Sequence, residues 1–285
     1  MLLQYHTTGV DLKKGVEFSK LSMMQTIMEN RNSHIFREQD LRGLTWQVLS
    51  VYRNNFSQFS ILTLAGMMPV LLISYFVATS LIGVLVVAFI ELLVITAIAG
   101  AFIYSVPYYY VNGRVNLQIS LRASRAVYFK LLSVTLGLQI ILGLLLTFSV
   151  AFPLLLVPFL VALLYMVYFV VTQPVVLIER QKPMEAFKRS LSLVRGNWGR
   201  VFGSTSILVL TVFGIGVLAW LPFFLISLVI PEGSELRGLI QQIGVWPASI
   251  LTIPPIYIFL TVLYYDLRYR KEDFNFKQLS DEISC

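Results

Sequence analysis

Long apolar runs alternate with polar, basic segments along this chain of 285 residues. A helix needs about 20 mostly apolar residues to cross the hydrocarbon core of a bilayer. The first run, from Phe59 to Pro107, is too long for one crossing, and the residues Thr79–Gly83 within it are typical of a tight turn. We therefore interpret this run as a pair of helices. The second run breaks at Ala151–Pro153 and the polar loop Pro231–Gln242 divides the third, so each of these also forms a pair.

This pattern predicts an all-α integral membrane protein with six transmembrane helices arranged as three hairpins. We expect the six-helix membrane domain over residues 35–271, after a cytoplasmic N-terminal segment at 1–34 and before a cytoplasmic tail at 272–285. The spans are expected at about 59–79, 83–106, 131–150, 154–178, 202–229 and 244–265.

The basic residues lie almost entirely on one side of the predicted spans. Of the 22 Lys and Arg residues, 21 lie in the polar segments 1–57, 107–130, 179–201 and 266–285, and the remaining one is Arg237. Segments rich in Lys and Arg near the ends of spans stay in the cytoplasm. We therefore expect a multi-pass protein of the cell (inner) membrane with both termini in the cytoplasm, and an even number of spans agrees with this orientation.

Each predicted hairpin follows a stretch with the pattern of a basic amphipathic helix. In the stretch 183–198, apolar residues from Met184 to Val194 recur at helical spacing, and Lys and Arg residues lie between them. Residues 41–52 repeat this pattern before the first hairpin. A helix with an apolar stripe and a basic opposite face can lie in the membrane interface. The stretch Arg114–Lys130 has the same position before the middle hairpin, but there an ordinary basic loop explains the pattern equally well.

Two of these stretches also match in sequence. At an offset of 142, the run Leu49–Phe56 (LSVYRNNF) aligns with Leu191–Trp198 (LSLVRGNW). Leu, Ser, Arg and Asn are identical, and both runs lead directly into a predicted span. The match indicates an internal repeat of one interfacial helix and one hairpin, found in the first and third units.

Two longer runs resemble a known group of proteins. The run Met184–Trp198 (MEAFKRSLSLVRGNW), which precedes a Gly-rich span, and the run Leu263–Phe274 (LYYDLRYRKEDF) are similar to sequences in poorly characterised prokaryotic six-span membrane proteins. That group includes the membrane domain attached to some glycerophosphodiester phosphodiesterases. The resemblance covers residues 35–275 and implies a six-helix module in the cell membrane. It implies no phosphodiesterase activity, because the catalytic barrel of those fusions has no counterpart in this sequence.

Composition and charge indicate a membrane surface as the partner of the basic segments. The chain is 57% hydrophobic and only 13% charged, whereas a soluble domain has about 25% charged residues. A net charge of +7 would favour nucleic acid only with a basic stripe on a soluble domain, so we expect anionic lipid headgroups instead. An ordinary anchor at the end of the last span is the alternative. The candidate headgroup contacts are Arg189, Arg195, Arg200, Arg268, Arg270 and Lys271.

The residues that would carry catalysis or bind metals are scarce. The chain has two histidines, His6 and His34, and one cysteine, Cys285. A zinc site needs several such ligands at suitable spacing, and a Ser-His-Asp arrangement needs a histidine beside the serine. No Gly-rich phosphate loop is present either. We therefore expect no enzyme activity and no cofactor.

Glu91 is the only Asp, Glu, Lys or Arg within the six predicted spans. A charged side chain at the centre of a bilayer costs about 2.5–3.5 kcal/mol on insertion scales, so such residues are commonly functional. Glu91 could couple transport to a proton or ion, or contact a cationic substrate. It could equally be a neutral structural residue that forms hydrogen bonds to a neighbouring helix, and the candidate partners are Gln139 and Tyr104.

These observations leave three functions, in decreasing order of support. The first is a non-catalytic membrane module that acts as a scaffold, an assembly partner of another membrane protein or a lipid-organising protein. The second is a transporter or lipid flippase that uses the intramembrane Glu91. The third is an intramembrane enzyme that acts on lipid, which would require a cluster of polar residues at the interface that the sequence does not display.

Overall fold

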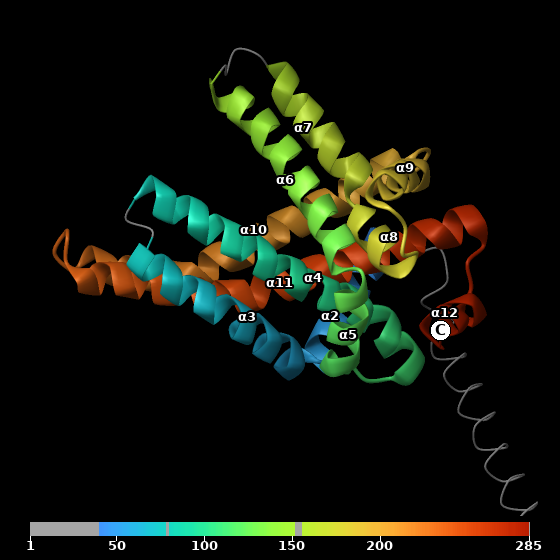
Figure 1. The fold of residues 1–285 in the computed structure, drawn as a ribbon, viewed down its shortest axis with the longest axis horizontal. Helices are drawn as coiled ribbons and strands as arrows, with labels where there is room; N and C mark the ends of the chain where they lie inside the picture. The colour runs from blue at the N-terminus through green and yellow to red at the C-terminus, as the bar shows by residue number, and fades with distance from the viewer. Residues whose placement is uncertain (1–39, 78–79, 152–155, 285) are drawn as a thin grey trace, which may run out of the picture.

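The computed structural model describes residues 40–77, 80–151 and 156–284, and this part of the chain is helical with short connections and no strand (Figure 1). The predicted N-terminal segment, 1–34, lies outside the described residues. The helices are α2 (Leu41–Asn54), α3 (Phe56–Val77), α4 (Leu81–Asn112), α5 (Leu117–Ala126), α6 (Tyr128–Ala151), α7 (Leu156–Phe169), α8 (Thr172–Ile178), α9 (Pro183–Val194), α10 (Trp198–Leu228), α11 (Glu235–Glu272) and α12 (Phe276–Ser284).

Six helical segments in the described part are long and apolar enough to cross a membrane, which confirms a multi-pass membrane protein of the all-α class. They are α3, α4, α6, Val157–Ile178, α10 and α11. The fourth contains both α7 and α8, which meet at a turn at Val170–Val171. Pro174 lies just beyond this turn and lacks the N–H that a continuous helix would need there.

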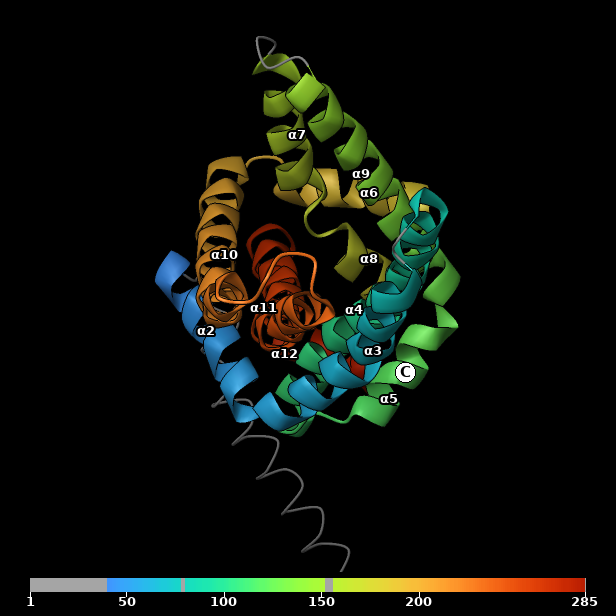
Figure 2. The same ribbon diagram turned by 90° about the vertical axis from the view of Figure 1, so that its left-hand side faces the viewer.

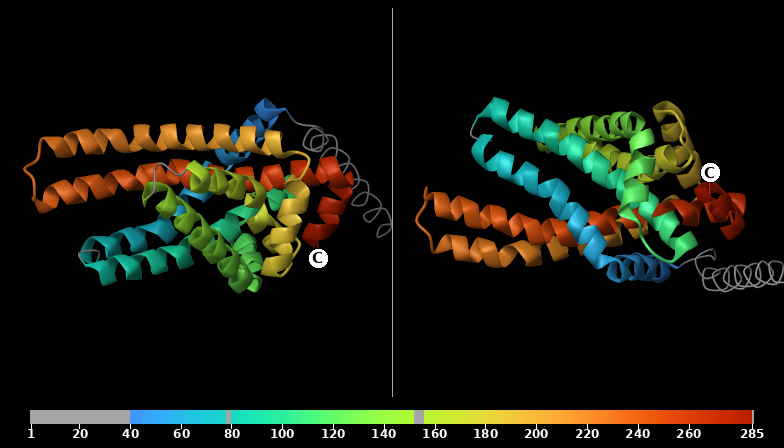
Figure 3. Two further views of the ribbon diagram at one scale, coloured as in Figure 1. Left: turned by 90° about the horizontal axis from the view of Figure 1, so that it is seen from above. Right: turned by 60° about the horizontal axis from the view of Figure 1, so that its bottom comes forward.

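Helix α11 lies at the centre of the structure. It packs against α10, α3, α2 and α4, and at one end against α8 and α9 (Figure 2). Consecutive long helices also pack against each other: α3 against α4, α6 against α7 and α10 against α11. The α6–α7 pair diverges from the other long helices (Figure 1). The turn between α10 and α11 lies at the end opposite α12 (Figure 3).

The short helices α9 and α12 lie near the end of α11 that carries Glu272 (Figures 1 and 3). Helix α2 crosses the middle of α11, where the Tyr52 hydroxyl donates a hydrogen bond to the carbonyl oxygen of Ile250, and α5 packs against α4. Small residues allow α5 to approach α4 closely. A Cβ atom built on Gly100 of α4 would lie 2.7 Å from the Cβ atom of Ser124 on α5, so any side chain at this position would force the two helices to shift. The hydroxyl groups of Ser105 and Ser120 form a hydrogen bond of 3.0 Å across the same contact.

Glycine is also required where α4 begins. Ser80 caps this helix, and its side chain accepts a hydrogen bond from the backbone N–H of Gly83. A Cβ atom on Gly83 would lie 1.8 Å from the carbonyl oxygen of Val77, at the end of α3. The chain can reverse here because residue 83 has no side chain.

In both runs that match in sequence a short helix leads into a long one, although the break is one residue in the first run and three residues in the second. In the first, α2 ends at Asn54 and α3 begins at Phe56; in the second, α9 ends at Val194 and α10 begins at Trp198. The short helix α5 precedes α6 in the same order, although its sequence differs from the other two.

The prediction of a polar loop at Pro231–Gln242 was wrong over most of its length, because helix α11 already begins at Glu235. The Ser234 side chain caps the helix by accepting a hydrogen bond from the N–H of Arg237. Polar side chains of the first turns also have partners on neighbouring helices: Gln241 donates to the Ser227 hydroxyl at 2.9 Å, and Gln242 donates to the Ser74 hydroxyl at 2.9 Å. Partners across the helix interface stabilise a segment whose sequence is typical of a loop.

Most of the segment predicted as a cytoplasmic tail, 272–285, is helical and docked. Its residues Phe276–Ser284 form α12, which packs against α4. Leu279 is fully buried, and Phe274, just before the helix, is 2% exposed. The spacing of Phe276, Leu279 and Ile283 gives this helix an apolar face, which explains why it docks.

Candidate functional site

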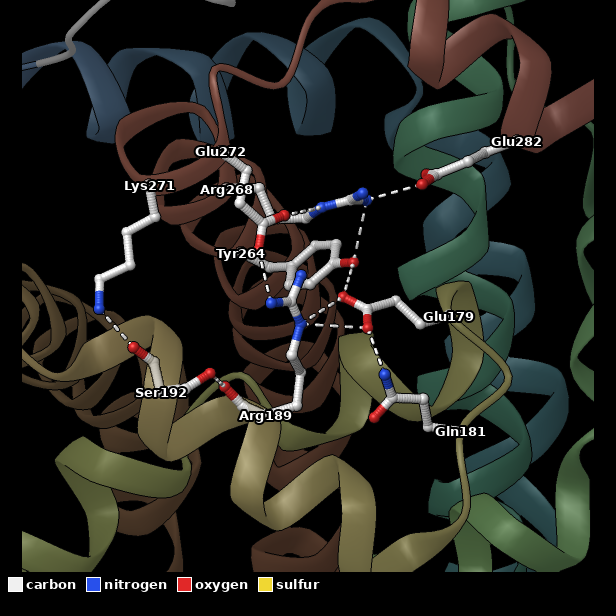
Figure 4. A network of polar contacts seen from close by, with 9 residues as sticks. All are labelled: Glu179, Gln181, Arg189, Ser192, Tyr264, Arg268, Lys271, Glu272 and Glu282. Carbon is white, nitrogen blue, oxygen red and sulfur yellow. Dashed lines mark hydrogen bonds and ion pairs between the residues drawn. The ribbon is translucent and has the colours of Figure 1, made fainter.

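A network of charged side chains joins α9, α11 and α12 at one end of the structure (Figure 4). Its centre is Glu179, which follows α8. The guanidinium group of Arg189 on α9 lies 3.1 Å from the Glu179 carboxylate and also forms an ion pair with Glu272 at the end of α11. The Gln181 amide donates a second hydrogen bond to Glu179, at 2.7 Å.

Arg268 extends this network to α12. Its guanidinium group lies 2.8 Å from the carboxylate of Glu282 on α12 and 3.3 Å from that of Glu272. It also donates a hydrogen bond of 3.1 Å to the hydroxyl of Tyr264, which in turn donates to Glu179 at 2.8 Å. The guanidinium carbon lies 3.8 Å from the ring centre of Phe274, a cation–π contact.

A second ion-paired group lies beside the first, at the start of α10. Arg200 of α10 lies 3.1 Å from the carboxylate of Asp266 on α11, and Arg270, one turn further along α11, lies 3.3 Å from it. The Asp266 side chain is only 2% exposed. Two guanidinium groups therefore offset the cost of removing this carboxylate from water.

The surroundings shift the pKa values of two network groups that lie outside the spans. Burial lowers the pKa of the Arg189 guanidinium, but its hydrogen bonds and charge interactions with Glu272 and Glu179 outweigh burial and hold the pKa above its ordinary value. For Glu282, burial raises the pKa of the carboxyl group above its ordinary value, and the opposing effect of Arg268 is smaller. Arg189 thus stays cationic at every physiological pH.

We call the network formed by Glu179, Gln181, Arg189, Tyr264, Arg268, Glu272 and Glu282 the clasp. Each carboxylate has a guanidinium or hydroxyl partner, and the partners come from elements that are far apart in sequence. The paired side chains are only partly buried, with 11–31% of each exposed, so each ion pair contributes less to stability than a fully buried pair would. The arrangement therefore fixes α9 and α12 against the end of α11.

The structure places most of the predicted headgroup contacts inside this clasp or beside it. Arg189, Arg200, Arg268 and Arg270 pair with carboxylates of the same chain. Lys271 donates a hydrogen bond to the carbonyl oxygen of Ser192. Arg195, directly after α9, is exposed. Lipid binding by the six residues stays a prediction, and the geometry favours it most at Arg195.

The structure does not join Glu91 to its predicted partners. Glu91 is exposed on α4, Gln139 is exposed on α6, and Tyr104 is half-buried. In residues 80–151, where all three lie, the hydrogen bonds made by side chains do not connect Glu91 with either partner. Glu91 is exposed on the outside of the helix. Both its proposed functional role and its proposed structural role stay predictions.

A large cavity lies between α2 and the α10–α11 pair. Its volume is about 870 Å³, within the usual range for small-molecule sites. Helix α2 covers one side of it, with Asp40, Arg42 and Trp46 among the lining residues. From α10 and α11 the lining residues are Ser204, Ile207, Leu208, Thr211, Val212, Ile215, Leu251, Pro255 and Phe259.

Sequence reasoning missed both the acidic half of the clasp and the cavity. Glu179, Glu272 and Glu282 lie in polar segments, where a charged residue is usually solvated. The sequence did contain a signal for these three glutamates, because each lies in or next to a segment that contains an arginine of the clasp. The cavity left no signal, because it depends on how α2 crosses two helices more than 140 residues away in the sequence.

No protein-family model matches this chain, and neither a curated protein nor a solved structure matches it. The resemblance of the runs Met184–Trp198 and Leu263–Phe274 to six-span prokaryotic membrane proteins therefore stays a prediction. In the described parts of the chain, His, Cys, Asp and Glu form no group of three or more that could hold a metal ion.

Proposed function

We propose that this protein is a non-catalytic multi-pass membrane module of the cell membrane that organises lipid at the cytoplasmic surface, where it could also act as a scaffold or assembly partner. Its units are three hairpins, each preceded by a basic amphipathic helix in the interface, and both termini lie in the cytoplasm. The module is of the kind found in the six-span prokaryotic proteins that its sequence resembles.

The exposed faces of the three short helices α2, α5 and α9 carry this proposal. Each presents exposed cations beside exposed large apolar side chains. On α2 these are Arg42 and Trp46, on α5 Arg122 and Leu121, and on α9 Lys188 and Met184. Apolar side chains that enter the headgroup region and cations that meet anionic lipid form one binding surface.

The clasp supports the same function, because it holds part of this surface in a fixed geometry. Arg189 joins α9 to α11 through Glu272, and Arg268 joins α11 to α12 through Glu282. A rigid end of the structure can present several headgroup contacts at once, and each basic residue near an anionic surface contributes about 1 kcal/mol.

Extraction of the full chain into polymer-bounded native nanodiscs would test the function. Mass spectrometry would then identify the retained lipids and proteins. We expect enrichment of anionic lipid over the bulk membrane, and loss of that enrichment when Arg122 and Lys188 are both changed to Gln. Bulk lipid composition together with a stoichiometric protein would mean that the module is a scaffold and does not organise lipid.

A transporter or lipid flippase is the second candidate, and the exposed carboxyl group of Glu91 within the apolar helix α4 favours it. If this candidate is correct, proteoliposomes will move fluorescent phosphatidylethanolamine between leaflets, and Glu91→Gln will abolish the movement. Glu235→Gln, at the exposed start of α11, is the matched control. Movement that is unchanged by Glu91→Gln would exclude a role for this residue.

A further inference from the structure

The cavity between α2 and the α10–α11 pair is a site that the clasp does not use. It runs along residues Ser204–Ile215, which belong to the first half of a membrane-spanning helix, and along residues Leu251–Phe259 of α11. Most of the lining side chains are apolar. An apolar space beside spanning helices is filled by whatever surrounds the protein, and in a bilayer that is lipid.

The polar lining side chains give the cavity a distinct end. Asp40 and Arg42 lie at the start of α2, and both side chains are exposed. The ion pairs of the described residues include neither of them. Toward the other end, the Tyr52 hydroxyl is already engaged, because it donates a hydrogen bond of 2.9 Å to the carbonyl oxygen of Ile250. An available cation at one end and an apolar remainder match a molecule with a phosphate head and hydrocarbon tails.

We propose that this cavity binds the acyl chains of one membrane glycerophospholipid, with its phosphate group at Arg42. The volume of about 870 Å³ lies in the upper part of the range for bound small molecules. Trp46, beside Arg42 and 68% exposed, is of the type that lies at headgroup depth. The inference rests on the proposed function and names the lipid class and the site.

The headgroup of the lipid, and not its acyl chains, should determine which lipid the cavity selects. Acyl chains in the bilayer are already in an apolar medium, so transfer into the cavity adds little hydrophobic driving force. Selectivity then depends on shape and on the ion pair between Arg42 and the phosphate group. Anionic and zwitterionic phospholipids share that phosphate group, whereas diacylglycerol lacks it.

Native mass spectrometry of the full chain, purified in mild detergent, tests the apolar part of the site. Thr211→Trp introduces a large side chain into the cavity from an exposed position. Val217→Trp, exposed on the same helix but outside the cavity lining, is the control. We expect about tenfold lower retention of the bound phospholipid with Thr211→Trp and unchanged retention with Val217→Trp. Equal retention in both variants would overturn the site but leave lipid organisation by the protein intact.

Exchange of the bound lipid with vesicles of defined composition tests the phosphate-binding end of the cavity at Arg42. Vesicles of phosphatidylethanolamine, phosphatidylglycerol or diacylglycerol in a phosphatidylcholine background supply the competing lipids. The protein should load either test phospholipid in preference to diacylglycerol, and Arg42→Gln should remove this preference. Loading of diacylglycerol equal to that of phospholipid would overturn the assignment of the phosphate group to Arg42. A dimer without lipid would mean that a second copy of the chain covers the cavity, and would also overturn the proposal.

Discussion

Asp266 shows at the scale of one residue how the chain handles charge at the edge of the membrane. Its carboxylate is almost fully covered and lies between two guanidinium groups, Arg200 and Arg270. Arg200 begins one spanning helix and Asp266 ends the next, so the pair connects α10 to α11 at one level. Close pairs of this kind are valuable mainly because either partner alone would be an uncompensated charge.

Asp266→Ala should therefore lower the free energy of unfolding by about 3–5 kcal/mol. Glu232→Ala is the matched control, since Glu232 forms an ion pair with Arg237 while its side chain is 91% exposed. That change should cost less than about 1 kcal/mol. Thermal unfolding of both variants in the same detergent measures the difference, and equal losses would contradict the ranking.

Glu282 gives a pH dependence whose sign can be derived. Burial raises its pKa in the folded state above the ordinary value, so the folded chain binds this proton more tightly than the unfolded chain. The contribution of this group to stability is fully present below the unfolded pKa and is lost as the pH rises through the folded pKa.

Glu282→Gln should consequently leave the Tm at pH 7 unchanged or raise it slightly. The corresponding change in the free energy of unfolding should be less than about 1 kcal/mol. It should also remove the contribution of this one group to the change in Tm between pH 7 and pH 5, a contribution that favours the lower pH. A clear loss of Tm at pH 7 would mean that attraction to Arg268 outweighs burial.

At the scale of elements, local sequence patterns predicted the helices that depend on composition alone. They missed the helical segments that depend on contacts with other parts of the chain. Six apolar segments were predicted and are present, because an apolar run of sufficient length is visible without knowledge of its neighbours. The start of α11 was assigned to a loop, because Gln241 and Gln242 are polar and only the fold supplies their partners on α10 and α3. The docked helix α12 was missed for a similar reason, since its apolar face is short and its anchor is Arg268.

The contact between α4 and α5 offers a test at this scale. Gly100→Ala should destabilise the protein by about 1–3 kcal/mol, because the new methyl group would overlap Ser124. Gly143→Ala on α6 is the control, since nothing lies within 4 Å of its Cβ position. That change should be neutral or stabilising by up to about 1 kcal/mol, because alanine favours a helix more than glycine does. Chemical or thermal unfolding of both variants would reveal any reversal of this order.

At the scale of the whole molecule, the structure separates two ends. Helices α9 and α12, which the clasp joins to α11, lie at one end, and the turn between α10 and α11 lies at the opposite end (Figure 3). The distribution of Lys and Arg predicts that the end with the clasp is cytoplasmic. The sequence could predict this polarity but not the clasp itself, because its members come from separate segments between Glu179 and Glu282.

The orientation can be measured with single cysteines in a Cys285→Ser background. In right-side-out membrane vesicles, a membrane-impermeant maleimide should label Glu232→Cys, in the turn between α10 and α11. Lys182→Cys, just before α9, should react only after the vesicles are opened. The reverse pattern would invert the assignment of both ends.

The divergence of the α6–α7 pair has a consequence for how the protein responds to its host membrane. None of residues 136–151 of α6 is buried, and the last polar contact between this pair and its continuation is the hydrogen bond of 3.0 Å from Gln173 to Thr135. Beyond it, α7 packs against α9 and α10, but the outer part of α6 is unburied, so we expect the angle of the pair to depend in part on the match between its apolar length and the thickness of the bilayer. A thinner bilayer would incline the pair further and a thicker one would bring it upright, and the shape of the protein would then report the thickness of its membrane.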